Sequence, residues 1–171
     1  VGAYLGFRAE RFGAEAGASL AELAAMAEQN IGEALGPAAA RAALAPFSRL
    51  AALQREVCPI LIDGRMHRWE WLRVDGRLIK TDALDHGDGH DLVGPQDVAW
   101  DVAGAAVELD LDAAGLARLV AAMPAGVRPS AELVAFLRVA YLGFQLGLWS
   151  FAVPQDERVS RHRALLSMRL P

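Results

Sequence analysis

The stretch DGRMHRWEWLRVDGRLIKTDALDH, residues 63–86, decides the fold prediction because it contains a strong turn signal between two alternating segments. Apolar and polar residues alternate in WEWLRV (69–74) and in RLIKTD (77–82), a pattern typical of half-buried strands. Asp75-Gly76 stands between them, and this dipeptide favours the tight turn of a β-hairpin. The sequence therefore predicts a small central hairpin, preceded by a short apolar strand, PILID (59–63).

Helical patterns fill the chain before this stretch. Ala, Leu and Glu dominate residues 1–57, and these residue types have high helix propensity. Ser19 followed by Glu22 is the signature of a capping box. Pro37 suits the first turn of a helix, whereas Pro46 predicts a bend. We expect helices over AYLGFRAERF (3–12), SLAELAAMAEQNIGEAL (19–35) and PAAARAALAPFSRLAALQREV (37–57).

Helical patterns return after the loop ALDHGDGHDLVG (83–94). They begin with PQDVAWDVAGAAVEL (95–109), and Ser130 is expected to cap a long apolar helix that reaches Pro154. QDERVSRHRALLSMRL (155–170) is predicted to form a last, amphipathic helix. The fold class is therefore α+β and mainly α-helical. One domain is expected, helical in 1–57, with a loop and hairpin in 58–94, and helical again in 95–171.

The composition excludes several classes of protein. At 171 residues, with 54% apolar and 22% charged residues, the chain suits one folded domain and is not disordered. A net charge of −4 and scattered arginines give no reason to expect a nucleic-acid partner. The most apolar window, 139–153, is shorter than the roughly 20 residues that span a bilayer, so we expect a core helix and no membrane. The single cysteine, Cys58, is interpreted as a buried thiol in a reducing cytoplasm.

Motifs in residues 63–104 point to a known family. DGRMHRWEWL (63–72) overlays a loop of the form H-G-D-x-H-x-x-N-x-L, and LIKTD (78–82) overlays a strand that ends in a metal-binding Asp. QDVAWDVA (96–103) overlays a helix start of the form G-D-P-A-x-D-L-A. These segments resemble the C-terminal lobe of the aminoglycoside phosphotransferase and choline kinase family, which has a protein-kinase-like fold. The resemblance implies a kinase-like C-terminal lobe around a degenerate catalytic loop.

The resemblance also implies roles for individual residues. His67 matches the loop, whereas Asp63 replaces its first His, Arg65 the catalytic Asp and Glu70 the metal-ligand Asn. Asp82 falls at the metal-binding Asp at the end of the hairpin. In the family, the Asp that matches Asp101 braces the catalytic loop from below. The implied cofactors are ATP and Mg²⁺.

Phosphoryl transfer explains why the replacements matter. It needs Mg²⁺ held by oxygen ligands and a carboxylate that accepts the proton of the substrate hydroxyl. Arg65 stays protonated, so it cannot be a base, although it could bind a phosphate group of the cofactor. Glu70 and Asp82 could still hold Mg²⁺. The base would then have to be Asp63 or His67.

The family's N-terminal lobe supplies a small sheet and a lysine for the nucleotide phosphates, which this chain does not match. Residues 1–57 are predicted to be helical, and Lys80 is the only lysine in the sequence. Because the sequence starts at Val1 within an apolar segment, we expect either a fragment that lacks this lobe or a protein that never had it.

Three functions remain open. The first is a small-molecule phosphotransferase-like protein with altered catalytic residues, which, if active, transfers phosphate from ATP to a hydroxyl. The second is a non-catalytic, pseudokinase-type domain that binds a phosphorylated ligand or a protein partner, with a homo-oligomer also open. The third is a metal-dependent hydrolase that uses His67, His86 and His90, although the glycines of 83–94 favour a solvated loop.

Structural interpretations compete with the functional ones. Arg65 is expected to form a salt bridge with a nearby carboxylate, from Asp63, Glu70 or Asp82, in place of a ligand contact. Trp69 and Trp71 are two residues apart in a predicted strand, so we expect both on one face, packed in the core.

Overall fold

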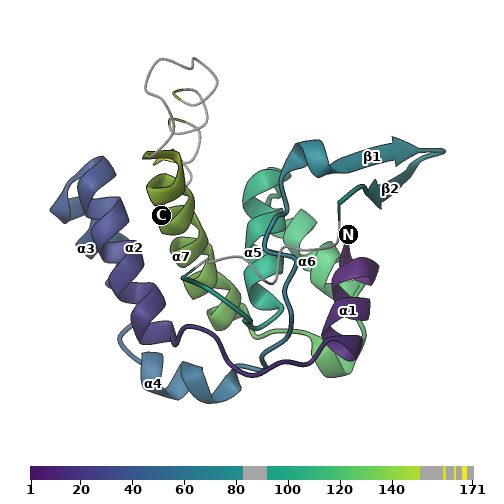
Figure 1. Cartoon of the computed structure of the whole chain (residues 1–171), viewed down its shortest axis with the longest axis horizontal. Coiled ribbons are helices and arrows are strands. Elements are labelled where there is room, and N and C mark those ends of the chain that lie inside the picture. The colour runs from purple at the N-terminus through teal and green to yellow at the C-terminus, as the bar shows by residue number, and fades with distance from the viewer. Residues whose placement is uncertain (83–91, 151–159, 161–163, 165–166, 169–171) are drawn as a thin grey trace.

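The computed structural model describes residues 1–82, 92–150, 160, 164, 167 and 168. Within these residues the protein is mainly α-helical, with seven helices and one antiparallel hairpin (Figure 1). The helices are α1 (Gly2–Arg11), α2 (Leu20–Leu35), α3 (Pro37–Leu44), α4 (Leu50–Leu53), α5 (Ala99–Glu108), α6 (Ala113–Ala121) and α7 (Ala131–Ser150). The strands are β1 (Trp71–Val74) and β2 (Arg77–Lys80), and short 3₁₀ turns are η1 (Gln54–Glu56), η2 (Arg68–Glu70) and η3 (Ala125–Val127).

Helix α7 forms the centre of the core. It packs against α2 on one side and α5 on the other, and α3 packs on α2 (Figure 1). By length and composition alone α7 could cross a membrane, with 20 residues and a mean hydropathy of 1.4, but most of it is buried inside the protein. Gly143 allows the close approach to α2, since a Cβ there would lie 2.8 Å from the Cα of Ala27. The prediction of a long apolar core helix is thus confirmed as far as Ser150.

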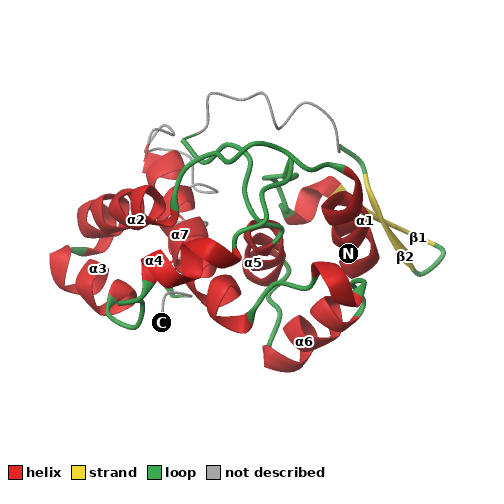
Figure 2. Cartoon of the chain, turned by 90° about the horizontal axis from the view of Figure 1, so that it is seen from below, coloured by secondary structure: helices red, strands yellow, loops and turns green. Residues whose placement is uncertain are grey.

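The hairpin forms where the Asp75-Gly76 signal predicts it. Trp71 pairs with Lys80 and Val74 with Arg77, and both turn residues have positive φ, 48° at Asp75 and 75° at Gly76. These angles are those that a tight two-residue hairpin turn requires. The hairpin projects from the side that carries α1, α5 and α6, away from α2 and α3 (Figures 1 and 2).

Because the hairpin projects, its strands are more exposed than the alternating pattern predicts. Trp71 is the buried residue of β1, whereas the apolar side chains of Leu72, Val74, Leu78 and Ile79 are exposed. The expectation for the tryptophans is wrong for one of them. Trp69 lies in the turn η2 before the strand begins and is 60% exposed.

The helix-end signals are confirmed. Ser19 and Glu22 form the capping box at the start of α2, and Pro37 occupies the first turn of α3. Between Leu44 and Leu50, however, the helix does not bend at Pro46 but stops and restarts as α4. Proline lacks the N–H that would continue the helical hydrogen bonds, which accounts for the stop.

The predicted strand 59–63 is wrong. Ile60 forms only isolated bridges, to Gly13 and to Gln96, so the segment is extended but joins no sheet. Cys58, expected to be buried, is exposed. The backbone of this segment makes isolated hydrogen bonds to Phe12, Ala14 and Gln96, so its pairing is too short to make a strand.

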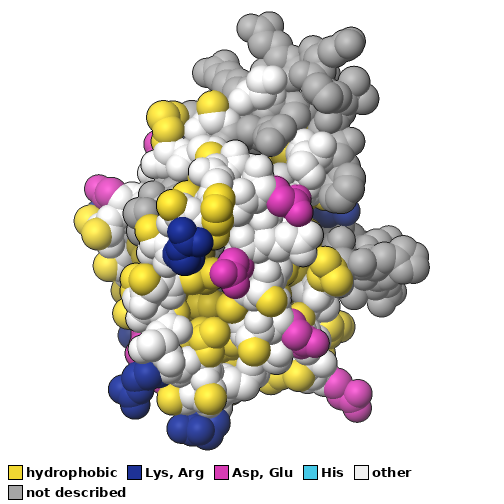
Figure 3. Space-filling model, turned by 90° about the vertical axis from the view of Figure 1, so that its left-hand side faces the viewer, with side chains coloured by type: hydrophobic (Ala, Val, Ile, Leu, Met, Phe, Trp, Pro, Cys, Tyr) yellow, Lys and Arg dark blue, Asp and Glu magenta, His cyan; other side chains and the backbone are white. Residues whose placement is uncertain are grey.

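The side of the molecule formed by α2 and α3 carries no concentrated charge among the described residues. Figure 3 shows apolar side chains in the middle of this face, with separate acidic and basic side chains around them. Most of the predicted helix over 155–170 and most of the loop 83–94 lie outside the described residues.

Candidate functional site

Two aspartates at the start of α5 hold the extended segment 58–64. Asp97 accepts a hydrogen bond from the backbone N–H of Cys58 at 2.9 Å. Asp101 accepts two, from the backbone N–H of Asp63 at 2.8 Å and of Gly64 at 2.9 Å. Since this segment joins no sheet, these carboxylates satisfy N–H groups that a strand would pair with a neighbour. Asp101 thus holds the loop at the backbone of Asp63 and Gly64.

Asp101 is fully buried among apolar residues of α5, and this changes its protonation. Burial, and then the nearby Asp63 carboxylate, raise the pKa of Asp101 to about 7, although the N–H groups of Asp63 and Gly64 act in the opposite direction. A carboxyl with such a pKa is partly protonated at neutral pH. The loop is therefore held by a group whose charge depends on pH.

The sole lysine of the chain lies at the centre of the site. The Nζ atom of Lys80 is 2.7 Å from Oε2 of Glu70 and 3.2 Å from Oδ1 of Asp63, and it also donates to the backbone carbonyl of Asp82. The side chain of Lys80 is only 3% exposed. An ammonium has three N–H donors, which matches these three oxygens in number. We call these four residues, Asp63, Glu70, Lys80 and Asp82, the Lys80 cluster.

Helix α1 completes the Lys80 cluster from a distant part of the sequence. The hydroxyl of Tyr4 donates to Oδ2 of Asp63, and Arg8 donates to the Tyr4 hydroxyl at 3.3 Å and to the carbonyl of Leu61 at 2.8 Å. Burial, followed by the contact with Asp63, raises the pKa of Tyr4 well above its ordinary value, so its hydroxyl remains a donor. Sequence reasoning missed both residues. Their spacing of four, which places them on one face of a helix, is the only signal that could have found them.

His67 belongs to a different set of contacts. Its Nδ1 lies 3.4 Å from Oε1 of Glu108 on α5, and its ring stacks on Trp69 with the centroids 4.4 Å apart. Tyr141 on α7 donates to the same Glu108 oxygen at 3.0 Å. Burial, and then Glu108, raise the pKa of Tyr141. His67 therefore contacts Glu108 of α5, which in turn accepts a hydrogen bond from Tyr141 of α7.

Arg65 lies at the edge of the site. Its side chain is exposed, and its backbone N–H donates to Oδ1 of Asp63 at 3.3 Å. The ion pairs with Asp63 and Glu70, which we expected for Arg65, are made by Lys80. The reason is the register of the hairpin, which pairs Lys80 with Trp71 at the base of β1, next to both carboxylates.

The structure brings Asp63, Glu70 and the backbone of Asp82 together around Lys80, whereas the side chain of Asp82 is exposed. Among the described residues no group of three His, Cys, Asp or Glu side chains could hold a metal ion. The histidines of the hydrolase hypothesis, His86 and His90, lie outside the described residues.

Comparison with known proteins gives no further guide to this site. No protein-family model, no curated protein and no solved structure matches the chain.

Proposed function

We propose that this chain is a non-catalytic domain related to the C-terminal lobe of kinase-like phosphotransferases, in which Lys80 replaces the metal ion. The observation that carries the proposal is the contact of the Lys80 ammonium with two carboxylates and one carbonyl. Support for the kinase-like lobe comes from the motif resemblance in residues 63–104. It also comes from the hydrogen bonds of Asp101 to the loop.

The residues of the Lys80 cluster do not fit Mg²⁺. A magnesium ion needs oxygen ligands free to surround it at about 2.1 Å. Here Glu70 and Asp63 already neutralise Lys80, and a second cation at the same oxygens would be repelled by the buried ammonium. We therefore do not expect Mg²⁺, which the resemblance implies together with ATP, to bind at the Lys80 cluster.

Among the described residues of the site, no side chain is arranged as a general base. Asp63 accepts from Tyr4 and from the backbone of Arg65, and it is paired with Lys80. His67 lies against Glu108. Arg65 stands where the family's base would be and cannot accept a proton. A proton acceptor must reach the reacting hydroxyl, and both candidates are engaged elsewhere.

A non-catalytic domain functions by binding, and the hairpin offers a surface for a protein partner. Its exposed apolar side chains, Leu72, Val74, Leu78 and Ile79, lie on a projecting two-stranded sheet (Figure 2). A two-stranded sheet has little stability of its own in water, so packing against a partner would stabilise it. Arg65, exposed at the edge of the site, could contact a phosphorylated group on such a partner.

Calorimetric titration of Mg²⁺·ATP tests this proposal against an active phosphotransferase. We expect no saturable heat from the wild-type chain. Saturable binding that the Asp82→Asn substitution abolishes would contradict the proposal and restore the enzyme hypothesis, because Asp82 is the metal ligand that the resemblance implies.

Titration with Mn²⁺, followed by electron paramagnetic resonance, tests the Lys80 cluster independently of any nucleotide. We expect the wild-type protein not to bind Mn²⁺ at this site, and the Lys80→Gln variant to gain a binding site because two carboxylates lose their cation. The double variant Lys80→Gln with Glu70→Gln is the control and should lose that site. Binding to the wild type that Glu70→Gln weakens would contradict the proposal.

A further inference from the structure

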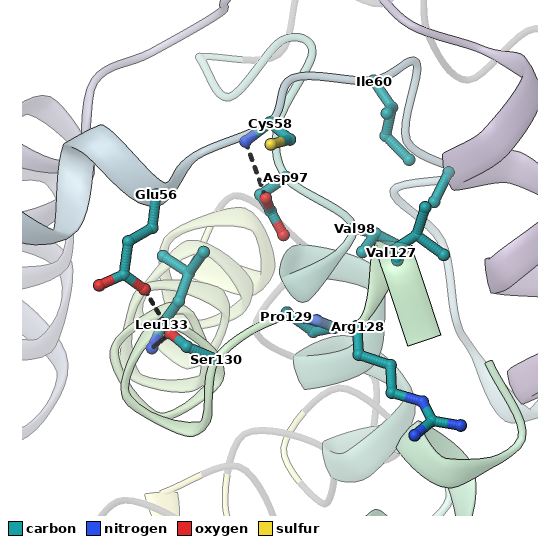
Figure 4. Close-up of a pocket in the computed structure, with 12 residues that line it drawn as sticks. Glu56, Cys58, Ile60, Asp97, Val98, Val127, Arg128, Pro129, Ser130 and Leu133 are labelled. Carbon is teal, nitrogen blue, oxygen red and sulfur yellow. Dashed lines mark hydrogen bonds between the residues drawn. The ribbon is translucent and has the colours of Figure 1, made fainter. Parts of the chain in front are cut away.

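A pocket of about 330 Å³ opens on a part of the molecule that shares no residue with the Lys80 cluster. It lies between the turn η1, the extended segment 58–60, the start of α5, the turn η3 and the start of α7 (Figure 4). Its walls are mainly apolar, formed by Ile60, Val98, Val127, Pro129 and Leu133. The size and the apolar walls are typical of sites that enclose small molecules.

Two carboxylates face this pocket. Glu56 accepts a hydrogen bond at 2.7 Å from Ser130, the residue before α7. Asp97, only 5% exposed, accepts the N–H groups of Cys58 at 2.9 Å and of Ala99 at 2.8 Å. Burial, opposed by these two N–H groups and reinforced by the charge of Glu56, raises the pKa of Asp97. These hydrogen bonds come from neutral donors, so they bring no positive charge into the pocket.

Among the described residues of the pocket, no cation neutralises these carboxylates. Arg128 is the one basic residue among the described residues that line it. Its guanidinium donates to the carbonyl of Met123 at 2.9 Å and to that of Ala121 at 2.8 Å. Figure 4 shows the guanidinium turned away from Glu56 and Asp97. The three ion pairs found among the described residues involve neither carboxylate.

We propose that this pocket binds a small organic cation, an amine whose ammonium lies between Glu56 and Asp97 and whose apolar part contacts Ile60, Val127 and Leu133. An anion is disfavoured because it would meet two carboxylates in a partly apolar space. A metal ion is disfavoured because the described residues include no group of three metal-ligating side chains. The inference does not rest on the proposed loss of catalysis, since the two sites share no residue.

Cys58 provides a direct probe of the pocket. It is the only cysteine in the sequence, it is exposed, and it lines the pocket beside Asp97 (Figure 4). An occupant should therefore shield its thiol from alkylation. The rate at which iodoacetamide modifies Cys58 near neutral pH, followed by mass spectrometry, measures that protection.

The probes are phenethylammonium and butylammonium, with phenethyl alcohol and butanol as neutral controls of similar shape. We expect the ammonium compounds to slow alkylation saturably, and the alcohols to have little effect at the same concentrations. Glu56→Gln should weaken the ammonium compounds about tenfold, as removal of one charged partner predicts. Glu28→Gln, an exposed substitution on α2, should leave them unchanged.

Three results would overturn the proposal. One is equal protection by the alcohols and the ammonium compounds. Another is protection that Glu56→Gln does not weaken. The last is an alkylation rate that none of the ammonium compounds lowers.

Discussion

Two aspartates one helical turn apart, Asp97 and Asp101, perform the same structural task in opposite surroundings. Each accepts backbone N–H groups from the extended segment 58–64. Beside Asp101 lies the Lys80 cluster, where a buried ammonium neutralises the other carboxylates. Beside Asp97 lies a pocket with a second carboxylate and no cation turned towards it among the described residues. The chain thus supplies its own cation at the Lys80 cluster, whereas we propose that the pocket beside Asp97 takes a cation from outside.

The largest effect is expected from Lys80→Met. It removes the cation that pairs with the buried carboxylates of Asp63 and Glu70 and should lower the free energy of unfolding by about 4 kcal/mol. Urea unfolding followed by circular dichroism measures the change. Arg65→Met is the matched control, since it removes an exposed arginine from the same loop, and it should cost less than about 0.5 kcal/mol. Equal losses in the two variants would contradict the assignment of Lys80 as the central cation.

The next effect comes from removal of the aspartates themselves. Asp101→Ala leaves two buried N–H groups unpaired and should lower the free energy of unfolding by about 3 kcal/mol. Asp97→Ala should cost less, about 1 to 2 kcal/mol. It leaves the buried N–H of Ala99 unpaired, but the N–H of Cys58 borders the pocket and can bond to water there. A larger loss for Asp97→Ala in the same unfolding experiment would reverse the comparison.

The two glutamates sharpen the contrast between the sites. Glu70→Gln removes the carboxylate that lies 2.7 Å from Lys80 and should cost about 2 kcal/mol. Glu56→Gln removes an exposed carboxylate beside Asp97 and should change stability by less than about 0.5 kcal/mol. Thermal unfolding of both variants under the same conditions gives the measurement. A loss for Glu56→Gln as large as that for Glu70→Gln would mean that its negative charge is structurally required.

The last effect is a gradual one, the pH dependence of stability. The pKa of Asp101 rises from its ordinary value of 3.8 to about 7 in the folded protein, so between these values the folded state holds a proton that the unfolded state has released. Its contribution to the free energy of unfolding therefore falls as pH rises, by up to about 1.4 kcal/mol per pH unit.

The Asp101→Asn variant isolates this contribution because an amide does not titrate. The stability of the wild type relative to this variant should decrease from about pH 4 to about pH 7, as urea unfolding at each pH would report. A relative stability that increases over the same range would mean that Asp101 is ionised more easily in the fold than in the unfolded chain.

The sequence predicted the features that local chemistry determines. Asp75-Gly76 placed the hairpin, and the pair Ser19 and Glu22 placed the start of α2. The strand at 59–63 failed as a prediction because strand formation depends on continuous pairing with a neighbour. This segment has only isolated backbone bridges at Ile60, and the side chains of Asp97 and Asp101 bind the N–H groups at its two ends.

The candidate site was less predictable than the fold. The loop residues came from motif resemblance, but Lys80 has the pattern of an ordinary strand residue. Its contacts depend on how the hairpin joins η2, which places Lys80 beside Glu70. They also depend on Asp63, which is held by Tyr4, 59 residues earlier in the sequence. The pocket at Cys58 has no sequence motif, because its lining comes from four separate stretches of the chain, around residues 9, 56–60, 97–98 and 126–133.

The central claim, that Lys80 is the buried cation of the site, can be tested by nuclear magnetic resonance on protein labelled with ¹⁵N-lysine. Lys80 is the only lysine, so its ammonium gives a single side-chain signal. The structure predicts that the signal is visible near neutral pH, because three oxygen partners slow proton exchange with water, and that Glu70→Gln weakens it. An ammonium that exchanges with water as fast as that of an exposed lysine, and so gives no signal, would contradict the account.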